Sequence, residues 1–272
     1  MAANYGATVF DGNFSHFGEK RSAPARTNWK YVAEYASEFL GTMMFAFFGS
    51  FPSAGAAGNG IALAVLVYCT ATASGGKLNP VVSLAVASVD TSSSLSASAV
   101  RVVLEAAVQI LGAAAGVAVA AAIDSGVTCF APPSGTGQGA VLLAEMFITL
   151  LLVLTVLSTA VEEAGKPRFG AVAPLAIGLS LFAGALTAGS LTGGSANPAR
   201  FLGAAIAGRH CSGRMHYAWS YLLGELLGAL VATLLHVARE AVRNQELASK
   251  GFVPARRPAA AANSYIRMEG SA

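Results

Sequence analysis

Residues 75–80 read Gly-Gly-Lys-Leu-Asn-Pro, and residues 193–198 read Gly-Gly-Ser-Ala-Asn-Pro. Each copy follows an apolar stretch and precedes a short apolar run, at 81–89 in the first case and at 199–207 in the second. Proline suits the first position of a helix, where its missing N–H costs nothing, and asparagine suits the capping position before it. Each copy therefore predicts a half-helix that begins at an Asn-Pro pair and is too short to cross a membrane.

The two copies belong to a larger duplication. Further landmarks recur in the same order: Glu-Phe-Leu-Gly-Thr at 38–42 and Glu-Met-Phe-Ile-Thr at 145–149, then Gln-Ile-Leu-Gly-Ala at 109–113 and Glu-Leu-Leu-Gly-Ala at 225–229. Landmarks at a nearly constant separation indicate two repeats, about 31–123 and about 140–238. An odd number of spans in each repeat inserts the second upside down relative to the first, and such inverted repeats place a functional site at the bilayer midplane.

Composition indicates a membrane protein. Hydrophobic residues make up 54% of the 272 residues and charged residues only 11%, which is less than half the share that is usual in soluble domains. Six apolar stretches approach the length of about 20 residues that spans a bilayer. They lie at 31–51, 59–74, 99–123, 140–161, 170–191 and 217–238.

We therefore predict an all-α membrane protein with six transmembrane helices and two re-entrant half-helices, arranged as an inverted repeat. The channel-like domain is expected over residues 30–240, between an N-terminal tail at 1–29 and a C-terminal tail at 241–272. The N-terminal tail carries no apolar stretch, so no cleaved signal peptide is expected.

The basic residues predict the orientation, because Lys and Arg near helix ends are retained in the cytoplasm. With six spans and both termini inside, only Arg200, Arg209 and Arg214 of the 17 Lys and Arg residues lie outside. We expect an integral, multi-pass protein with both termini cytoplasmic, in the plasma membrane rather than an internal one. The net charge of +3 follows from this bias, so no nucleic-acid partner is expected. A disulfide between Cys129 and Cys211, which fall on the same outer side, is left open.

Half-helices that enter from opposite faces would meet tip to tip, with their positive dipole ends at the centre, where they disfavour cations. The amides of Asn79 and Asn197 could donate to a passing oxygen. A water molecule whose oxygen accepts from both donors would have no lone pair left to accept along the file, so a proton wire would be interrupted. Irregular backbone at this depth is allowed only where it lines a cavity or is buried in protein. We therefore expect a line of accepting carbonyls from Gly75, Gly76, Lys77, Gly193, Gly194 and Ser195.

Glu38 and Glu145 need partners, since a charge near the bilayer centre costs about 2.5–3.5 kcal/mol on insertion scales. The re-entrant segments offer backbone N–H groups that these carboxylates could accept, which would anchor both loops. A proton relay through Glu38, Glu145 and Glu225 is the functional alternative.

Residues 74–81 and 192–200 resemble the paired Asn-Pro-Ala loops of the major intrinsic proteins, the family of aquaporins and aquaglyceroporins. The likeness covers about residues 31–240. It implies a six-helix bundle with one pore per subunit, usually a homotetramer, that passes water or small neutral solutes through a lipid bilayer without a cofactor or metal. The motif residues are Asn79, Pro80, Val81, Asn197, Pro198 and Ala199. The small-residue pairs 112/116 and 224/228 would permit the close helix packing that such a bundle requires.

The resemblance also implies a selectivity filter. Arg200, three residues after Asn197, matches the family's filter arginine, and ungapped counting places the other positions at Asn59, Ala185 and Gly194. Water-strict members carry an aromatic residue and a histidine here, and this chain has neither. We therefore expect a wider, partly polar filter that admits glycerol, urea or ammonia besides water. A water-selective channel is the alternative, because Phe201 stands where glycerol facilitators usually carry an aspartate.

Two positions depart from the family pattern. Val81 replaces the usual alanine, and Lys77 stands where many members have histidine. The Lys77 side chain could face the inner vestibule or the lipid headgroups.

Functions of other classes are disfavoured. A secondary transporter built from inverted repeats would need an ion site or a large conformational change, and the sequence places no acidic pair at the Asn tips. An enzyme is not expected, because the loops lack a His-and-acid cluster or a Ser–Lys pair placed to act together.

Overall fold

A computed structural model describes residues 28–127, 129–162, 165–209 and 215–250. Within these residues the protein is built from six long helices and two helices of ten residues each. The long helices are α1 (Asn28–Ser50), α2 (Gly55–Ser74), α4 (Leu95–Ile123), α5 (Gln138–Val156), α7 (Ala173–Thr192) and α9 (Ala218–Ser249). The short ones are α3 (Pro80–Val89) and α8 (Pro198–Ala207). A π-helical turn (Leu157–Val161) extends α5, and α6 (Lys166–Phe169) with a 3-10 turn (Gly170–Val172) leads into α7. A second 3-10 turn, Met215–Tyr217, precedes α9.

The predicted all-α membrane fold is confirmed. Five helical segments are long and apolar enough to cross a bilayer: Gly55–Ser74, Leu95–Ile123, Gln138–Val161, Lys166–Thr192 and Met215–Ser249. The remaining long helix, α1, has 23 residues and is also long enough, at about 1.5 Å per residue. Its first half carries Lys30, Glu34 and Glu38, so its apolar character is weaker than that of the other five.

The largest difference from the predicted bounds is at the end of α9, which continues to Ser249, well past the predicted end at 238 and into the predicted C-terminal tail. Charged side chains support this extension. Arg239 and Arg243 each lie 2.5 Å from a Glu162 carboxylate oxygen. Arg243 also pairs with Glu240, and Lys250 with Glu246, and such pairs of opposite charge three or four residues apart stabilise an exposed helix. Hydrophobicity alone could not predict such a polar extension.

Glycines bring the helices of each repeat into backbone contact. A Cβ at Gly112 or Gly116 of α4 would collide with the Phe39 or Met43 carbonyl oxygen of α1. In the second repeat, Gly224 and Gly228 of α9 meet α5 in the same way, at the carbonyl oxygens of residues 142 and 146. Small residues permit such close approach in membrane bundles, so the two predicted glycine pairs are confirmed as packing positions.

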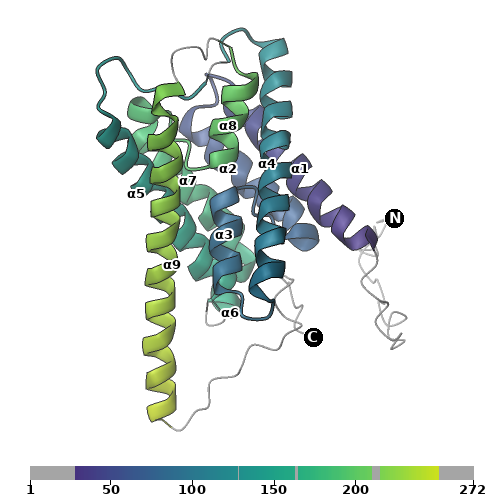
Figure 1. Cartoon of the computed structure of the whole chain (residues 1–272), viewed down its shortest axis with the longest axis vertical. Coiled ribbons are helices and arrows are strands. Elements are labelled where there is room, and N and C mark those ends of the chain that lie inside the picture. Colours follow the sequence, from purple (N-terminus) through teal and green to yellow (C-terminus); the bar gives the residue numbers. More distant parts are fainter. Residues whose placement is uncertain (1–27, 128, 163–164, 210–214, 251–272) are drawn as a thin grey trace, which may run out of the picture.

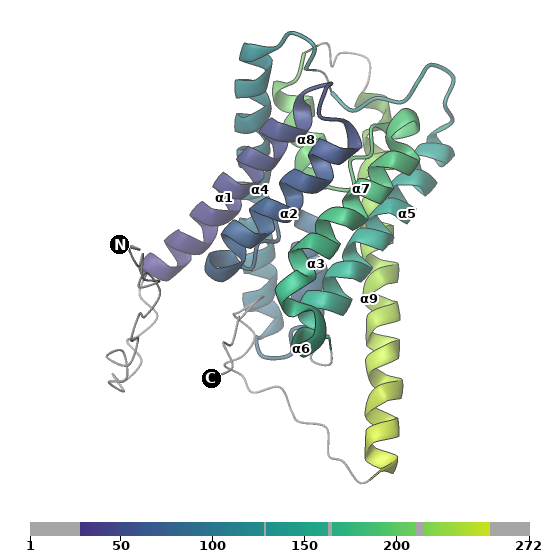
Figure 2. The same ribbon diagram turned by 180° about the vertical axis from the view of Figure 1, so that it is seen from behind.

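The two half-helices lie end to end inside the bundle, with α8 above α3 and both between α4 and α9 (Figure 1). The view from behind shows α1, α2, α7 and α5 on the other side of the bundle (Figure 2). Gly203 of α8 packs against Ala113 and Ala114 of α4, so the half-helix of the second repeat rests on a long helix of the first. The two repeats therefore interlock.

Two predictions concern residues that the structure does not describe. The Cys129–Cys211 pairing involves Cys211, which lies outside the described residues, as do residues 1–27 of the predicted N-terminal tail at 1–29.

Candidate functional site

The half-helices begin as the Asn-Pro pairs predict. Asn79 and Asn197 have extended backbones, with φ of −162° and −161°, and each caps the helix that follows. The Asn79 side-chain oxygen accepts from the Val81 backbone N–H at 3.1 Å. The Asn197 oxygen accepts from Ala199 at 2.9 Å and from Arg200 at 3.4 Å. Each cap satisfies helix N–H groups that would otherwise lack a partner.

The two tips are joined by a reciprocal pair of hydrogen bonds. Nδ2 of Asn79 donates to the Ala196 carbonyl at 2.8 Å, and Nδ2 of Asn197 donates to the Leu78 carbonyl at 2.8 Å. An amide nitrogen carries two hydrogens. Each asparagine therefore donates one N–H to the opposite loop and has a second N–H that can donate to a neighbouring molecule.

The loops before the two asparagines have the same backbone conformation. Gly75 and Gly193 have φ of 96° and 84°, and Gly76 and Gly194 follow with 62° and 64°. Leu78 and Ala196 then take φ of 50° and 48°, which is uncommon for residues other than glycine and costs on the order of 1–3 kcal/mol each.

Glu38 holds the first loop in this conformation. Its carboxylate, which is fully buried, accepts from the backbone N–H of Lys77 at 3.0 Å and of Leu78 at 2.8 Å. It also accepts from the Ser74 hydroxyl at 2.7 Å and from Nε2 of Gln109 at 2.8 Å. The strained Leu78 is thus held through its N–H by Glu38 and through its carbonyl by the opposite asparagine.

Glu145 holds the second loop in the equivalent way, accepting from the backbone N–H of Ser195 at 3.1 Å and of Ala196 at 2.8 Å. Glu225 adds a second carboxylate, whose Oε1 accepts from the Asn197 N–H at 2.8 Å. The expectation that no acidic pair lies near the Asn tips is therefore wrong for the second tip. Both carboxylates are fully buried and bind backbone N–H groups, which favours anchoring over a proton relay.

The four residues that the sequence predicts as a filter lie close together, around Arg200. Its guanidinium donates to the Ser195 carbonyl at 3.1 Å and the Gly194 carbonyl at 3.4 Å, and its other terminal nitrogen contacts the side-chain oxygen of Asn59. A Cβ built on Gly194 would lie 3.1 Å from Cα of Ala185, and Gly194 has a φ of 64°, so a side chain there would be crowded and strained. A Cβ at Gly49 of α1 would meet Asn59 and Arg200. The polar pair therefore lies beside α1, and the two remaining positions contribute almost no bulk.

Two aromatic residues that sequence reasoning missed face the Arg200 guanidinium. Its central carbon lies 4.8 Å from the ring centroid of Phe45 and 5.2 Å from that of Phe130, within cation–π range. Phe45 belongs to the apolar run of α1, where nothing distinguishes it from its neighbours. Phe130 lies in the connection from α4 to α5, where a large aromatic residue among small ones is a signal that could have been used.

The side chain of Lys77 turns into the protein. Its Nζ lies 2.9 Å from a Glu105 carboxylate oxygen of α4 and donates to the Ser74 carbonyl at 2.8 Å. Only 9% of the Lys77 side chain and 6% of the Glu105 side chain are exposed. The charge of Lys77 is therefore compensated inside the protein, whereas the sequence left open whether it faces the inner vestibule or the lipid headgroups.

The two other unusual motif positions are part of the core. Phe201 is 2% exposed and stacks on Tyr221, with ring centroids 4.5 Å apart. Val81 is 5% exposed and packs with buried apolar residues of both repeats.

A cavity of about 270 Å³ lies on one side of Arg200 and is lined by Phe130, Gly189 and Gly193 among others. A much smaller space, about 10 Å³, lies at the tips, where Asn79 and Asn197 share a wall with apolar side chains of α2, α5 and α7. A narrow passage with apolar walls and a few fixed polar groups is the arrangement of a selective membrane pore. Fold and site together define an integral, multi-pass membrane channel.

Comparisons with known proteins agree. The sequence model of the major intrinsic protein family matches residues 25–236. The chain is 33% identical over 257 residues to aquaporin A of Dictyostelium discoideum, and the alignment covers 85% of this chain and 87% of that protein. It is 34% identical over 216 residues to aquaporin-2 of Ovis aries, covering 74% of this chain and 76% of that protein. Its fold is similar to the X-ray structure of the aquaglyceroporin from Plasmodium falciparum, with a TM-score of 0.62, 24% identity, and coverage of 76% of this chain and 95% of that one. The protein belongs to the major intrinsic protein family.

Proposed function

We propose that the protein is a passive channel that conducts water and small uncharged solutes, such as glycerol, urea or ammonia, and excludes protons and ions. The observation that carries this proposal is the reciprocal link between Asn79 and Asn197. It fixes two amide donors at the meeting point of the half-helices, and each donor has an N–H to spare for a passing oxygen.

Ion exclusion follows from the charges around this point. The N-termini of α3 and α8 converge at the tips, so both positive dipole ends face the same space. Apolar residues supply the rest of the wall. An ion that sheds its hydration shell there therefore meets few polar groups that could replace the lost water molecules. Water bonded through its oxygen to both amides has no lone pair free to accept a proton from the next molecule, and the proton wire is broken.

Arg200 adds a positive barrier outside the tips. Its guanidinium is held by two loop carbonyls and by Asn59, so the charge stays in place without a mobile counter-ion. Ala185 and Gly194 leave the rest of the filter without bulky side chains, which supports passage of solutes larger than water. The relatives named aquaporin support water itself as a substrate.

The assembly and orientation are part of the proposal. The protein forms a homotetramer with one pore per subunit and lies in the plasma membrane with both termini in the cytoplasm. The end of α9 supports this orientation, because it carries the basic residues Arg239, Arg243 and Lys250. This end of α9 lies where the chain would leave the membrane. No cofactor or metal is required for the mechanism.

Stopped-flow light scattering on proteoliposomes tests the function. Water, glycerol, urea and ammonia fluxes are each compared with those of protein-free liposomes, with and without a pH gradient. Water flux above the protein-free level together with flux of at least one solute is expected. Water flux without any solute flux would select the water-selective alternative, and solute flux driven by the pH gradient would indicate a transporter.

Substitution Arg200→Val tests the barrier. We expect cation conductance to rise while water flux is retained. Arg209→Val is the matched control, because Arg209 lies on the same side of the bundle and its guanidinium binds the Ala121 carbonyl away from the filter. Ion exclusion that is unchanged in Arg200→Val would contradict the assigned role.

A further inference from the structure

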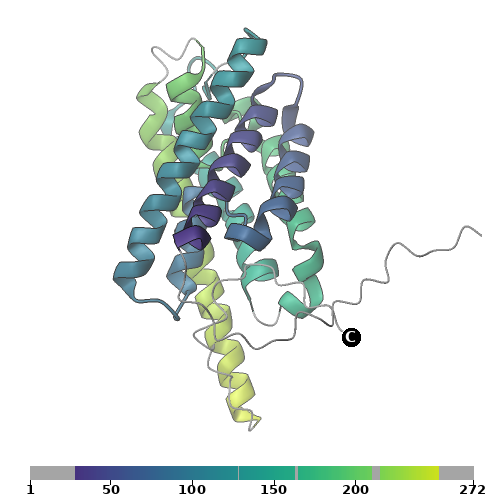
Figure 3. The same cartoon turned by 90° about the vertical axis from the view of Figure 1, so that its right-hand side faces the viewer.

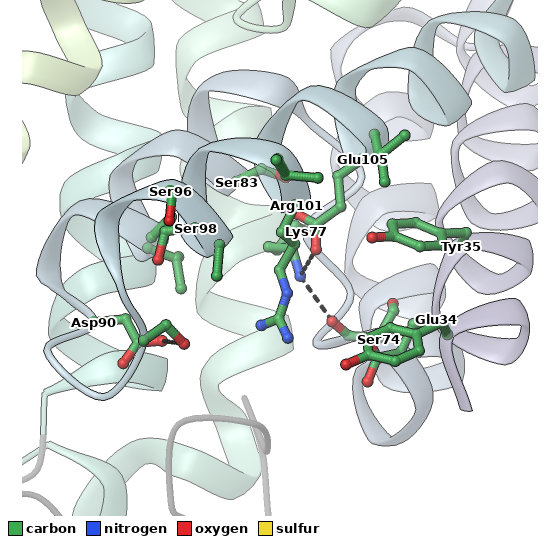
Figure 4. A pocket seen from close by; sticks show the side chains of 17 residues that line it. Glu34, Tyr35, Ser74, Lys77, Ser83, Asp90, Ser96, Ser98, Arg101 and Glu105 are labelled. Carbon is green, nitrogen blue, oxygen red and sulfur yellow. Dashed lines mark hydrogen bonds and ion pairs between the residues drawn. The ribbon is translucent and has the colours of Figure 1, made fainter. Parts of the chain in front are cut away.

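A second cavity, about 590 Å³ in volume, lies between α1, α3 and α4 at the end of the bundle where α1 begins. Neither asparagine of the tips and no filter residue lines it. Figure 3 shows α1 and α4 side by side, and Figure 4 shows the cavity from close by. We call it the lateral crevice. It has no part in the transport mechanism above.

The inner end of the crevice is charged. Lys77 and Glu105 line it and form the buried ion pair described above. Glu105 lies ten residues from the start of α4, so it is about 15 Å along the helix and at a depth where hydrocarbon would surround it. Charged side chains at this depth need polar surroundings. Acyl chains alone would therefore be a poor filling for the crevice.

The middle of the crevice has charges of both signs. The guanidinium of Arg101 projects into it, with Asp90 to one side and Glu34 to the other (Figure 4). Arg101 is six residues from the start of α4, about 9 Å along the helix, which is close to the depth of lipid phosphates and glycerol groups. An occupant with one negative and one positive group would match this order of charges.

The wall toward the membrane is apolar. Val100 and Leu104 of α4 line the crevice and are 60% and 44% exposed. One ligand thus meets charged groups inside and exposed aliphatic side chains outside. Phospholipids have this combination, and soluble phosphate esters lack the apolar part.

We propose that the lateral crevice binds the headgroup of a zwitterionic aminophospholipid, with its phosphate on Arg101 and its ammonium group toward Glu34. Guanidinium binds phosphate through two parallel, charge-assisted hydrogen bonds, and a primary ammonium group has three N–H donors for carboxylates. Phosphocholine lacks those N–H donors, and phosphoglycerol lacks the positive charge. The site therefore selects phosphatidylethanolamine over both.

Lipid binding to the delipidated full chain in detergent tests this selection. Native mass spectrometry and the thermal unfolding midpoint are measured with short-chain phosphatidylethanolamine, phosphatidylcholine or phosphatidylglycerol, and with free phosphoethanolamine and inorganic phosphate. We expect phosphatidylethanolamine to bind at least about tenfold more tightly than the other two lipids, as the loss of one charge-assisted contact implies. Equal binding of the three lipids would overturn the selection. If free phosphoethanolamine bound as tightly as phosphatidylethanolamine, the proposal that the ligand is a lipid would be overturned.

Three variants locate the site, with water flux as the check that each is folded. Arg101→Gln is expected to lose about tenfold in affinity for phosphatidylethanolamine, whereas Arg168→Gln, an exposed arginine of α6, keeps it. Glu34→Gln is expected to lower phosphatidylethanolamine binding toward the phosphatidylcholine level. Ala97→Trp fills the crevice without changing a charge and is expected to abolish binding. Wild-type binding in folded Arg101→Gln and Ala97→Trp would overturn the proposal.

Discussion

The two pore loops have the same backbone but place their charges differently. Both have the same sequence of positive φ angles, both are held by a buried glutamate, and each asparagine binds the other loop. In the first loop the basic residue, Lys77, turns away and is paired with Glu105. In the second, Arg200 stays at the passage, bound to carbonyls and Asn59.

The second support of each loop also differs. Gln109 of the first repeat donates to Glu38 and to Ser83, whereas its counterpart, Glu225, accepts the Asn197 N–H. The first loop thus relies on one carboxylate for its backbone bonds and the second on two. The duplicated backbone builds both loops, and the unequal charges leave a cation beside the passage in the second loop alone of the two.

The largest effect should come from removing the single anchor of the first loop. Glu38→Ala leaves two buried backbone N–H groups without their acceptor, which costs about 2–6 kcal/mol at 1–3 kcal/mol for each group. Glu145→Ala should cost less, because Glu225 still holds the second loop. Thermal unfolding in detergent measures both, with the exposed Glu246→Ala as control. A larger loss for Glu145→Ala would refute the idea that the first loop has the weaker support.

Breaking the buried ion pair should come next. Lys77→Met leaves the Glu105 charge buried and unpaired, which typically costs about 3–5 kcal/mol, whereas replacing both partners by apolar residues is often close to neutral. We therefore expect the Lys77→Met/Glu105→Leu double variant to recover most of the stability. Ion exclusion should stay intact in the double variant, in contrast to Arg200→Val. A gain of cation conductance would show that Lys77 also acts as a barrier.

A smaller effect is expected at the tips. Asn79→Ala and Asn197→Ala each remove one cross-link and one cap, and loss of a cap costs about 0.5–2 kcal/mol. Asn197→Ala should be worse by about 0.5–1.5 kcal/mol, one further hydrogen bond, because only Asn197 caps two N–H groups. Unfolding midpoints and water fluxes of the two variants test this order. Equal losses would mean that the long bond to the Arg200 N–H contributes nothing.

The smallest effect is expected at Phe130. Phe130→Leu removes one of the two rings at Arg200, and a cation–π contact contributes about 0.5–2 kcal/mol. A looser guanidinium should raise the flux of the largest permeant solute by about two- to eightfold, which is the ratio that corresponds to the lower half of that energy range. Phe169→Leu, an exposed position on α6, is the control. No change in the ratio of solute to water flux would assign Phe130 to packing alone.

Sequence reasoning found what local patterns encode. The Asn-Pro pairs fixed the first residues of both half-helices, the repeated glutamates indicated the anchors, and the intact motifs made counting to Asn59 and Ala185 reliable. It did not find Glu105, Phe45 or Phe130. Their roles depend on which side chain lies opposite in the folded bundle, and one apolar or acidic residue on a long helix resembles another until that partner is known. The direction of Lys77 was undetermined for the same reason.

The reciprocal asparagine bonds also bear on how the protein is made. Each joins residues more than a hundred positions apart, Asn79 to Ala196 and Asn197 to Leu78. The first re-entrant segment leaves the ribosome long before its partner has been synthesised. Until then it stays in the translocon or the bilayer without its hydrogen bonds to the second loop. Closure of the passage is therefore a late step of biogenesis, and a chain truncated after its first half has the sequence of a pore loop without the means to complete one.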